Sequence, residues 1–119
     1  MQKILLIEDS REVAGILFEY YESKGVELDY ADNGELGFEL AKAESFDLIL
    51  LDLMLPRMDG LTLCNKLRDE GITTPILMLT ALDNREDMLN GFKHGADDYL
   101  TTPFDFDVLD ARANALIKR

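Results

Sequence analysis

Apolar and polar positions along this chain form five successive pairs of a short apolar run and a longer amphipathic stretch. The runs predict strands at about residues 3–8, 26–31, 46–51, 75–80 and 96–101. The stretches predict helices near residues 10–24, 33–43, 60–70, 84–94 and 106–118. In the first helix, apolar residues follow the i, i+3, i+4, i+7 spacing of a helix packed on a sheet, at Val13, Ile16, Leu17 and Tyr20. The pattern therefore predicts five βα units.

Three of the predicted strands are apolar at consecutive positions, over residues 4–7, 48–51 and 76–79. Such strands are buried on both faces, as in a parallel sheet between two layers of helices. The second and fifth strands are more polar, which is typical of sheet edges. We therefore predict an α/β fold with a doubly wound parallel sheet, whose ligand crevice lies beyond the carboxyl ends of the strands.

Residues that favour helix ends support these boundaries. Asp32 and Asp83 each stand three residues before a glutamate, a variant of the capping box, and we predict that both are N-caps. Gly25, Gly71 and Gly95 follow predicted helices at positions where a left-handed terminating residue is expected.

Length and composition predict one domain over residues 1–119. The apolar fraction of 47% excludes a disordered chain. No apolar run reaches the roughly 18 residues that a membrane-spanning helix needs, and no leader pattern precedes the first strand, so we expect a cytoplasmic protein without a membrane association. The one cysteine, Cys64, lies among apolar residues of a predicted helix and favours a buried small hydrophobe over a redox centre.

The net charge of −12 comes from 24 acidic and 12 basic residues. Such acidity repels a nucleic-acid backbone. We therefore expect no direct nucleic-acid binding by this segment.

Three carboxylates follow two of the buried strands: Glu8 and Asp9 after the first, and Asp52 after the third. If these strands are parallel neighbours, the acids meet in one pocket. Two such charges 4 Å apart repel by about 4 kcal/mol at an effective dielectric constant near 20. A cation must offset this repulsion, and oxygen-only ligands suit Mg²⁺.

Several motifs, in this order, resemble those of response-regulator receiver domains of two-component signalling. They are Ile7-Glu8-Asp9, the stretch from Asp52 to Gly60, Leu79-Thr80-Ala81, and the stretch from Gly95 to Leu100 followed by Pro103-Phe104. The resemblance covers the whole chain and is strongest to the subfamily with a winged-helix DNA-binding output domain. It implies a flavodoxin-like receiver fold with strand order 2-1-3-4-5.

The resemblance makes Asp52 the phosphoacceptor. It also implies that Mg²⁺ is held directly by Asp9, Asp52 and the backbone carbonyl of Met54, and by Glu8 through a water molecule. A carboxylate can attack a phosphoryl group when a metal shields the negative donor. The domain then catalyses only its own phosphorylation and dephosphorylation and is otherwise not an enzyme.

The resemblance assigns the switch to Thr80 and Tyr99. The Thr80 hydroxyl is expected to bond the new phosphoryl group, while Tyr99 turns inward to fill the vacated space. A phosphoryl group adds about −2 of charge, a local change with a bistable readout.

One position departs from the family pattern. Receivers carry a lysine before the proline that follows the fifth strand, whereas this chain has Thr102 before Pro103. Arg57 and Lys93 are the nearest other cations by loop topology, and neither stands at the family position. We therefore expect impaired phosphorylation or impaired coupling of the phosphate to Thr80.

The resemblance also implies partners. The phosphodonor is a sensor histidine kinase, and DNA is bound through a C-terminal domain outside this segment. The chain is expected to form a homodimer through its fourth helix, fifth strand and fifth helix. Charged residues match the subfamily's ion pairs, and apolar Met88 and Val108 replace another pair. The expected interface residues are Met88, Phe92, Asp97, Asp98, Val108, Arg112 and Arg119.

Two other functions are compatible with the predicted topology. The missing lysine favours a receiver-like interaction module that works without phosphorylation. A flavodoxin-like flavin carrier or small hydrolase is disfavoured, because Glu8 and Asp9 in the first loop would repel a flavin phosphate.

Overall fold

The computed structural model describes residues 2–119, so Met1, the first residue of the predicted domain, lies outside the described residues. Strands and helices alternate along these residues, as the apolar pattern predicted. In chain order they are β1 (Lys3–Ile7), α1 (Arg11–Ser23), β2 (Glu27–Ala31), α2 (Gly34–Ala43), β3 (Leu48–Leu51), α3 (Gly60–Asp69), β4 (Ile76–Thr80), α4 (Arg85–Lys93), β5 (Asp98–Thr101) and α5 (Phe106–Ile117).

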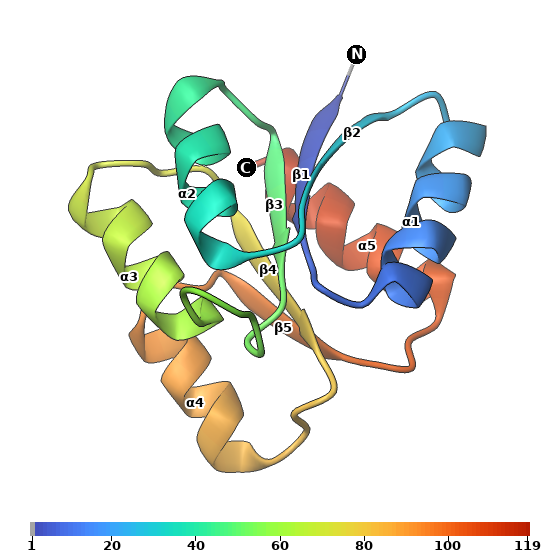
Figure 1. Cartoon of the computed structure of the whole chain (residues 1–119). Coiled ribbons are helices and arrows are strands. Elements are labelled where there is room, and N and C mark those ends of the chain that lie inside the picture. Colours follow the sequence, from blue (N-terminus) through green and yellow to red (C-terminus); the bar gives the residue numbers. More distant parts are fainter. Residues whose placement is uncertain (1) are drawn as a thin grey trace.

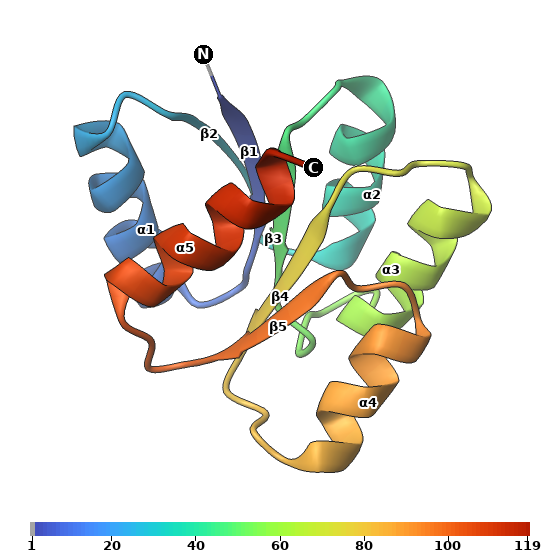
Figure 2. The same ribbon diagram turned by 180° about the vertical axis from the view of Figure 1, so that it is seen from behind.

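The strands form one parallel sheet in the order β2-β1-β3-β4-β5. Helices α1 and α5 cover one face, and α2, α3 and α4 lie on the other (Figures 1 and 2). The doubly wound fold and the strand order are therefore confirmed. The polar second and fifth strands are the sheet edges, as their sequences predicted.

The consecutive apolar positions of β1 serve both faces of the sheet. Leu5 and Ile7 belong to the apolar layer under α2 and α3, whereas Ile4 and Leu6 belong to the layer under α1 and α5. All four side chains are buried, as expected of a parallel strand between two helical layers. Within the described residues, no helix is both long and apolar enough to cross a membrane.

The prediction that Asp32 and Asp83 are N-caps was wrong. Asn33 and Asn84 cap α2 and α4, and their side chains accept the backbone N–H three residues ahead at 2.9 and 2.8 Å. The helices begin one residue later than predicted, and asparagine satisfies the free amides as well as aspartate does. The helix-ending glycines are confirmed, with φ angles of 72°, 79° and 112° at Gly25, Gly71 and Gly95.

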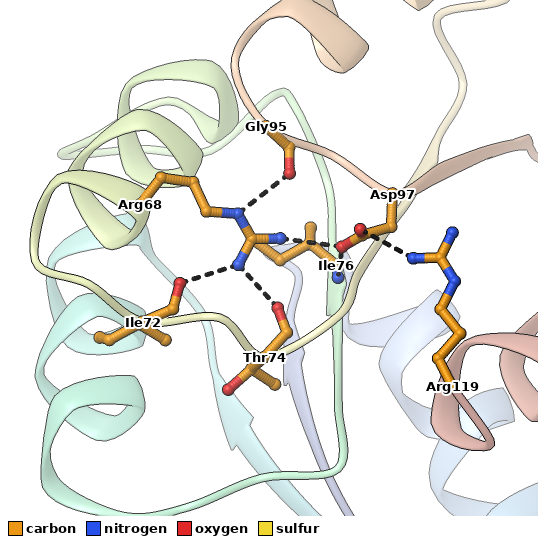
Figure 3. A network of polar contacts seen from close by, with 7 residues as sticks. All are labelled: Arg68, Ile72, Thr74, Ile76, Gly95, Asp97 and Arg119. Carbon is orange, nitrogen blue, oxygen red and sulfur yellow. Dashed lines mark hydrogen bonds and ion pairs between the residues drawn. The ribbon is translucent and has the colours of Figure 1, made fainter.

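A polar network around Arg68 joins the loops at the amino-terminal edge of the sheet (Figure 3). The Arg68 guanidinium donates to the carbonyl oxygens of Gly95 at 3.1 Å, Ile72 at 2.9 Å and Thr74 at 2.8 Å. One arginine on α3 thereby fixes both the α3–β4 and the α4–β5 connections.

Asp97 completes this network. Its Oδ2 accepts from Arg68 and from the backbone N–H of Ile76, each at 2.8 Å, and its Oδ1 accepts from Arg119 at 3.2 Å. Two residues that the sequence placed at a dimer interface, Asp97 and Arg119, therefore form an ion pair within one chain.

Candidate functional site

The three predicted carboxylates meet at the carboxyl edge of the sheet. Strands β1 and β3 lie side by side with Ile7 opposite Leu51, and the acids follow these residues directly. The Asp52 backbone N–H donates to the Ile7 carbonyl at 3.0 Å, which continues the pairing by one residue. One carboxylate oxygen from each of Glu8, Asp9 and Asp52 lies within 4.8 Å of the others. The parallel register thus brings together residues that stand more than forty positions apart in the sequence.

Glu8 is the most deeply placed of these acids, with 3% of its surface exposed. Burial, followed by the charge of Asp52, raises the pKa of Glu8 to about 8. The backbone N–H of Ser10 donates to Glu8 Oε2 at 3.0 Å and opposes this shift. Asp52 is also buried, at 8% exposed. Two of the three carboxyl groups are therefore buried, and the backbone N–H groups of Ser10 and Met54 donate to them.

A cavity of about 300 Å³ opens beside the acids. Thr80, at the end of β4, is 1% exposed and lines it together with Asp52. Met54 stands at its rim with a side chain that is 54% exposed. The lining residues are Glu8, Asp9, Ser10, Val13, Asp52, Met54, Thr80, Ala81 and Thr102.

Thr102 is on this lining, at the position where the resemblance led us to expect a lysine. Its backbone N–H donates to the Thr80 carbonyl at 2.8 Å, and its peptide bond to Pro103 is cis. Arg57 and Lys93 do not line the cavity. Within residues 2–119, the lining therefore contributes three carboxylates and no basic side chain.

The loop after Asp52 is held by Gly60. A Cβ atom at this position would lie 2.3 Å from the Asp52 carbonyl oxygen, so no other residue fits without moving the loop. The Gly60 N–H donates to the Leu53 carbonyl at 2.9 Å, and Asp59 caps α3 by accepting from Thr62 at 2.9 Å. The Asp-Gly pair before a helix was visible in the sequence, but the close approach to Asp52 was not.

Two further residues position Glu8, and sequence reasoning missed both. Ser10 caps α1 through its hydroxyl, which accepts from Val13 at 3.3 Å, while its N–H holds the Glu8 carboxylate. The Tyr30 hydroxyl donates to the Glu8 carbonyl oxygen at 2.7 Å. A serine before a helix is a recognisable N-cap pattern, whereas the Tyr30 contact crosses from β2 and leaves no trace in the sequence.

Tyr99 lies on β5 with its ring turned inward and 5% of its surface exposed. Its hydroxyl donates to the Leu82 carbonyl oxygen at 2.6 Å, and the Leu82 N–H donates to Thr80 Oγ1 at 3.3 Å. Burial raises the pKa of Tyr99 to about 12. Tyr99 thus occupies the inward position that the resemblance associates with switching, and it is joined to Thr80 through one residue's backbone.

The predicted interface residues lie on α4, β5 and α5, except that Asp97 directly precedes β5 and Arg119 follows α5. Strand β5 is the sheet edge between α4 on one face and α5 on the other (Figure 2). Large apolar side chains are exposed there: Met88 at 37%, Phe92 at 42% and Val108 at 40%. The Arg112 guanidinium donates to both carboxylate oxygens of Asp98 in the same chain, at 3.0 and 3.1 Å. This surface therefore combines exposed apolar residues with charges that already have partners.

Comparison with known protein families shows the family to which this chain belongs. The family profile of the response regulator receiver domain matches residues 4–114, and the chain belongs to this family. Solved receiver domains share the fold described above.

Individual relatives agree. The transcriptional regulatory protein CiaR of Streptococcus pneumoniae is 44% identical over 124 residues, which cover 100% of this chain and 53% of CiaR. The receiver domain of the Francisella response regulator 1452 has a TM-score of 0.94 at 37% identity, covering 100% of this chain and 98% of that one.

A third relative bears on the acid pocket. The receiver domain of a sensor histidine kinase from Pseudomonas aeruginosa PAO1, described with a magnesium ion coordinated in its active site cleft, has a TM-score of 0.91 at 29% identity. The alignment covers 99% of this chain and 98% of that one. This chain spans about half the length of the curated transcriptional regulators that it matches.

Proposed function

We propose that this domain is a phosphorylation-controlled switch of a two-component system, in which Asp52 accepts a phosphoryl group from a sensor histidine kinase. One observation carries the proposal: the buried Asp52 carboxylate shares a cavity with two further carboxylates and with the Thr80 hydroxyl. This constellation suits phosphoryl transfer to a carboxylate better than it suits an interaction surface.

The donor set fits Mg²⁺. It consists of oxygen atoms only. Burial first, and the charges of Asp52 and Asp9 after it, raise the pKa of Glu8, and a bound cation would favour its charged form. Asp9, Asp52 and the Met54 carbonyl would bind the ion directly, and Glu8 would bind through a water molecule. The bound ion would shield the charge of the incoming phosphoryl group. The magnesium in the related Pseudomonas receiver supports this assignment.

The residues of this chain then have distinct roles. An Asp52 carboxylate oxygen attacks the phosphorus atom of the kinase phosphohistidine, the P–N bond breaks, and the histidine nitrogen keeps the electron pair. Thr80 is placed to donate its hydroxyl hydrogen to a phosphoryl oxygen. Thr102 offers a neutral hydroxyl where the family has an ammonium group.

We further propose that phosphorylation changes the α4, β5 and α5 surface and favours a homodimer across it. Met88, Phe92 and Val108 supply apolar area for that contact. The output is then transcription control through a DNA-binding domain, as the names of the relatives suggest. Both the kinase reaction and DNA binding would take place in the cytoplasm.

Mass spectrometry after treatment with acetyl phosphate and Mg²⁺ tests this function. We expect one added phosphoryl group on the wild-type chain and none on Asp52→Asn, which keeps the size of the side chain but removes the nucleophilic carboxylate. Asp9→Asn should reduce labelling by weakening the metal site. Undiminished labelling of Asp52→Asn would place the acceptor elsewhere.

A second function is favoured by Thr102, namely a receiver-like interaction module that works without phosphorylation. The same experiment separates the two. A wild-type chain that takes no phosphoryl group, together with a Thr102→Lys variant that does, would support the module.

A further inference from the structure

The ring of Tyr99 packs against one particular residue of α4. Among the residues of α4, Gly91 is the buried one, whereas the neighbouring Leu89 and Phe92 are 44% and 42% exposed. Met78, which lies opposite Tyr99 in the β4–β5 register, also borders this position. The inward Tyr99 ring therefore lies between a strand and a helix that contributes no side chain to the contact.

The space at Gly91 is tight for a methyl group while the ring is inward. A Cβ atom there would lie 3.2 Å from Tyr99 Cδ2, 3.4 Å from Cε2 and 3.9 Å from Met78 Cγ. The first distance is shorter than ordinary van der Waals contact, so either the ring or the helix would have to move by a few tenths of an ångström.

Glycine is less favourable than alanine in a helix interior. At position 91 the contact with the Tyr99 ring explains why a glycine is suitable nonetheless. Gly15 in α1 provides the comparison, because a Cβ atom there would have nothing within 4 Å. The two residues carry the same cost in helix propensity. Only Gly91 makes room for another side chain.

The Tyr99 position is also linked to the acid cavity. The Tyr99 hydroxyl is bonded to the Leu82 carbonyl, and the Leu82 N–H is bonded to Thr80 Oγ1. Thr80 lines the cavity beside Asp52. If the Thr80 hydroxyl turns away, Leu82 loses a hydrogen bond of its backbone N–H. The carbonyl oxygen of the same residue holds the Tyr99 hydroxyl, so the change can reach the Tyr99 ring.

We propose that Gly91 is the positioning residue for Tyr99. Because Gly91 has no side chain, α4 leaves the space that the inward ring occupies. A rearrangement at Thr80 can thereby change the position of the Tyr99 ring and, through it, the α4 surface. This inference rests on the proposed switch function. It extends the proposed switch, which consists of the acid pocket, Thr80 and Tyr99, by one residue of α4.

The first test follows the ring itself and needs no phosphoryl donor. Gly91→Ala and Gly91→Leu should displace the Tyr99 ring resonances in NMR spectra, the leucine variant more strongly. The matched control Gly15→Ala should leave them in place and raise Tm by about 3 °C. Gly91→Ala should gain less, because the new methyl group meets the ring. Far-UV circular dichroism checks that each variant is folded.

Removal of the ring should restore the normal effect of alanine. In a Tyr99→Ala background, Gly91→Ala should raise Tm as Gly15→Ala does. If Gly91→Ala leaves the Tyr99 resonances unchanged and raises Tm fully in the wild-type background, the inference is wrong.

The second test follows the switch. With Mg²⁺ present, Gly91→Ala should need about tenfold more beryllofluoride than wild type for the same change at the α4 surface, read from Phe92 resonances. Gly15→Ala should respond as wild type does. An equal response of Gly91→Ala and wild type would refute the inference. A wild-type chain that does not respond would instead refute the proposed function, while the ring test would still decide the role of Gly91.

Discussion

Glu8 is a carboxylate whose burial makes stability depend on pH. Its pKa of about 8 in the folded chain exceeds the ordinary value of 4.5. Between these values the folded state holds a proton that the unfolded state has lost, so stability falls as pH rises through this window. In the presence of a chelator, Glu8→Gln should therefore lose less Tm than wild type between about pH 5 and pH 8.

The control for this measurement is Glu19→Gln, which changes an exposed glutamate of α1. It should follow the wild-type pH dependence. Identical slopes for wild type and Glu8→Gln would show that Glu8 is already ionised in the folded chain. Adding Mg²⁺ in place of the chelator should reduce the wild-type slope, because a bound cation favours the charged form.

Thr102 leaves the cavity without a basic side chain. An ammonium group near a doubly charged phosphoryl group contributes on the order of a few kcal/mol, whereas a neutral hydroxyl contributes about 1 kcal/mol. Thr102→Lys should therefore bind beryllofluoride about tenfold more tightly in the presence of Mg²⁺. Fluorine NMR titration measures the affinity.

Thr101→Lys serves as the control, because it adds the same charge at the neighbouring position, which does not line the cavity. It should behave as wild type. Equal affinities for wild type and Thr102→Lys would show that Mg²⁺ alone neutralises the pocket and that the missing lysine has no effect on binding.

The positions of the acids could be predicted from the sequence, whereas their supports could not. Glu8, Asp9 and Asp52 follow buried strands, and parallel strands end at one edge, so pattern alone brings them together. The contacts of Tyr30 with Glu8 and of Gly91 with Tyr99 join elements that are distant in the chain. No local pattern records such contacts.

Helix α3 is attached to two loops by a single side chain, that of Arg68. Its guanidinium reaches three carbonyl oxygens and one carboxylate, while the side chain is 24% exposed. Arg68→Ala leaves these acceptors unsatisfied and should destabilise the domain by about 2–4 kcal/mol. Arg68→Lys should recover only part of this loss, because an ammonium group lacks the planar fork of donors.

Urea unfolding measures the effect as a lower midpoint with an unchanged slope. Arg85→Ala, which removes an exposed arginine of α4, should shift the midpoint little. If Arg68→Ala unfolds like Arg85→Ala, the network contributes nothing to stability.

The elements were predictable in number and type, and their ends less so. The apolar runs gave every strand, but the third was predicted from residue 46 and begins at Leu48. Phe46 is buried against the core although it precedes the strand, so its apolar character misplaced the start. The mistaken caps have a similar cause: Asp32 and Asn33 are both good cap residues, and the pattern does not decide between neighbours.

The whole molecule exposes an apolar surface on α4 and α5, and any association through it should depend on apolar contact more than on charge. Arg112 already has Asp98 as its partner within the chain. Phe92→Asp should therefore weaken the beryllofluoride-induced dimer at least tenfold, and Arg112→Glu should weaken it less. Sedimentation velocity measures both.

Leu36→Asp is the matched control, because Leu36 is 43% exposed on α2 and Phe92 is 42% exposed on α4. It should leave the dimer unchanged. Raising the salt concentration should also have little effect, since screening weakens charge pairs and not apolar burial. A dimer that survives Phe92→Asp would have its interface on another surface.

At this scale the sequence predicted the architecture well, because consecutive apolar strands and amphipathic helices admit few arrangements. It did not predict that Asp97 and Arg119 would pair within one chain. The two residues are distant in the sequence, and the pair forms only because the fold brings the residues after α5 beside the loop before β5.

The Arg68 network and the acid cavity stand at opposite edges of the same sheet. Residues that secure the loops, such as Arg68 and Asp97, therefore share no contacts with Asp52 or Thr102. Substitutions at the carboxyl edge can alter chemistry while the scaffold remains intact. The response to phosphate can therefore be altered at one edge of the sheet without loosening the loops that the other edge holds together.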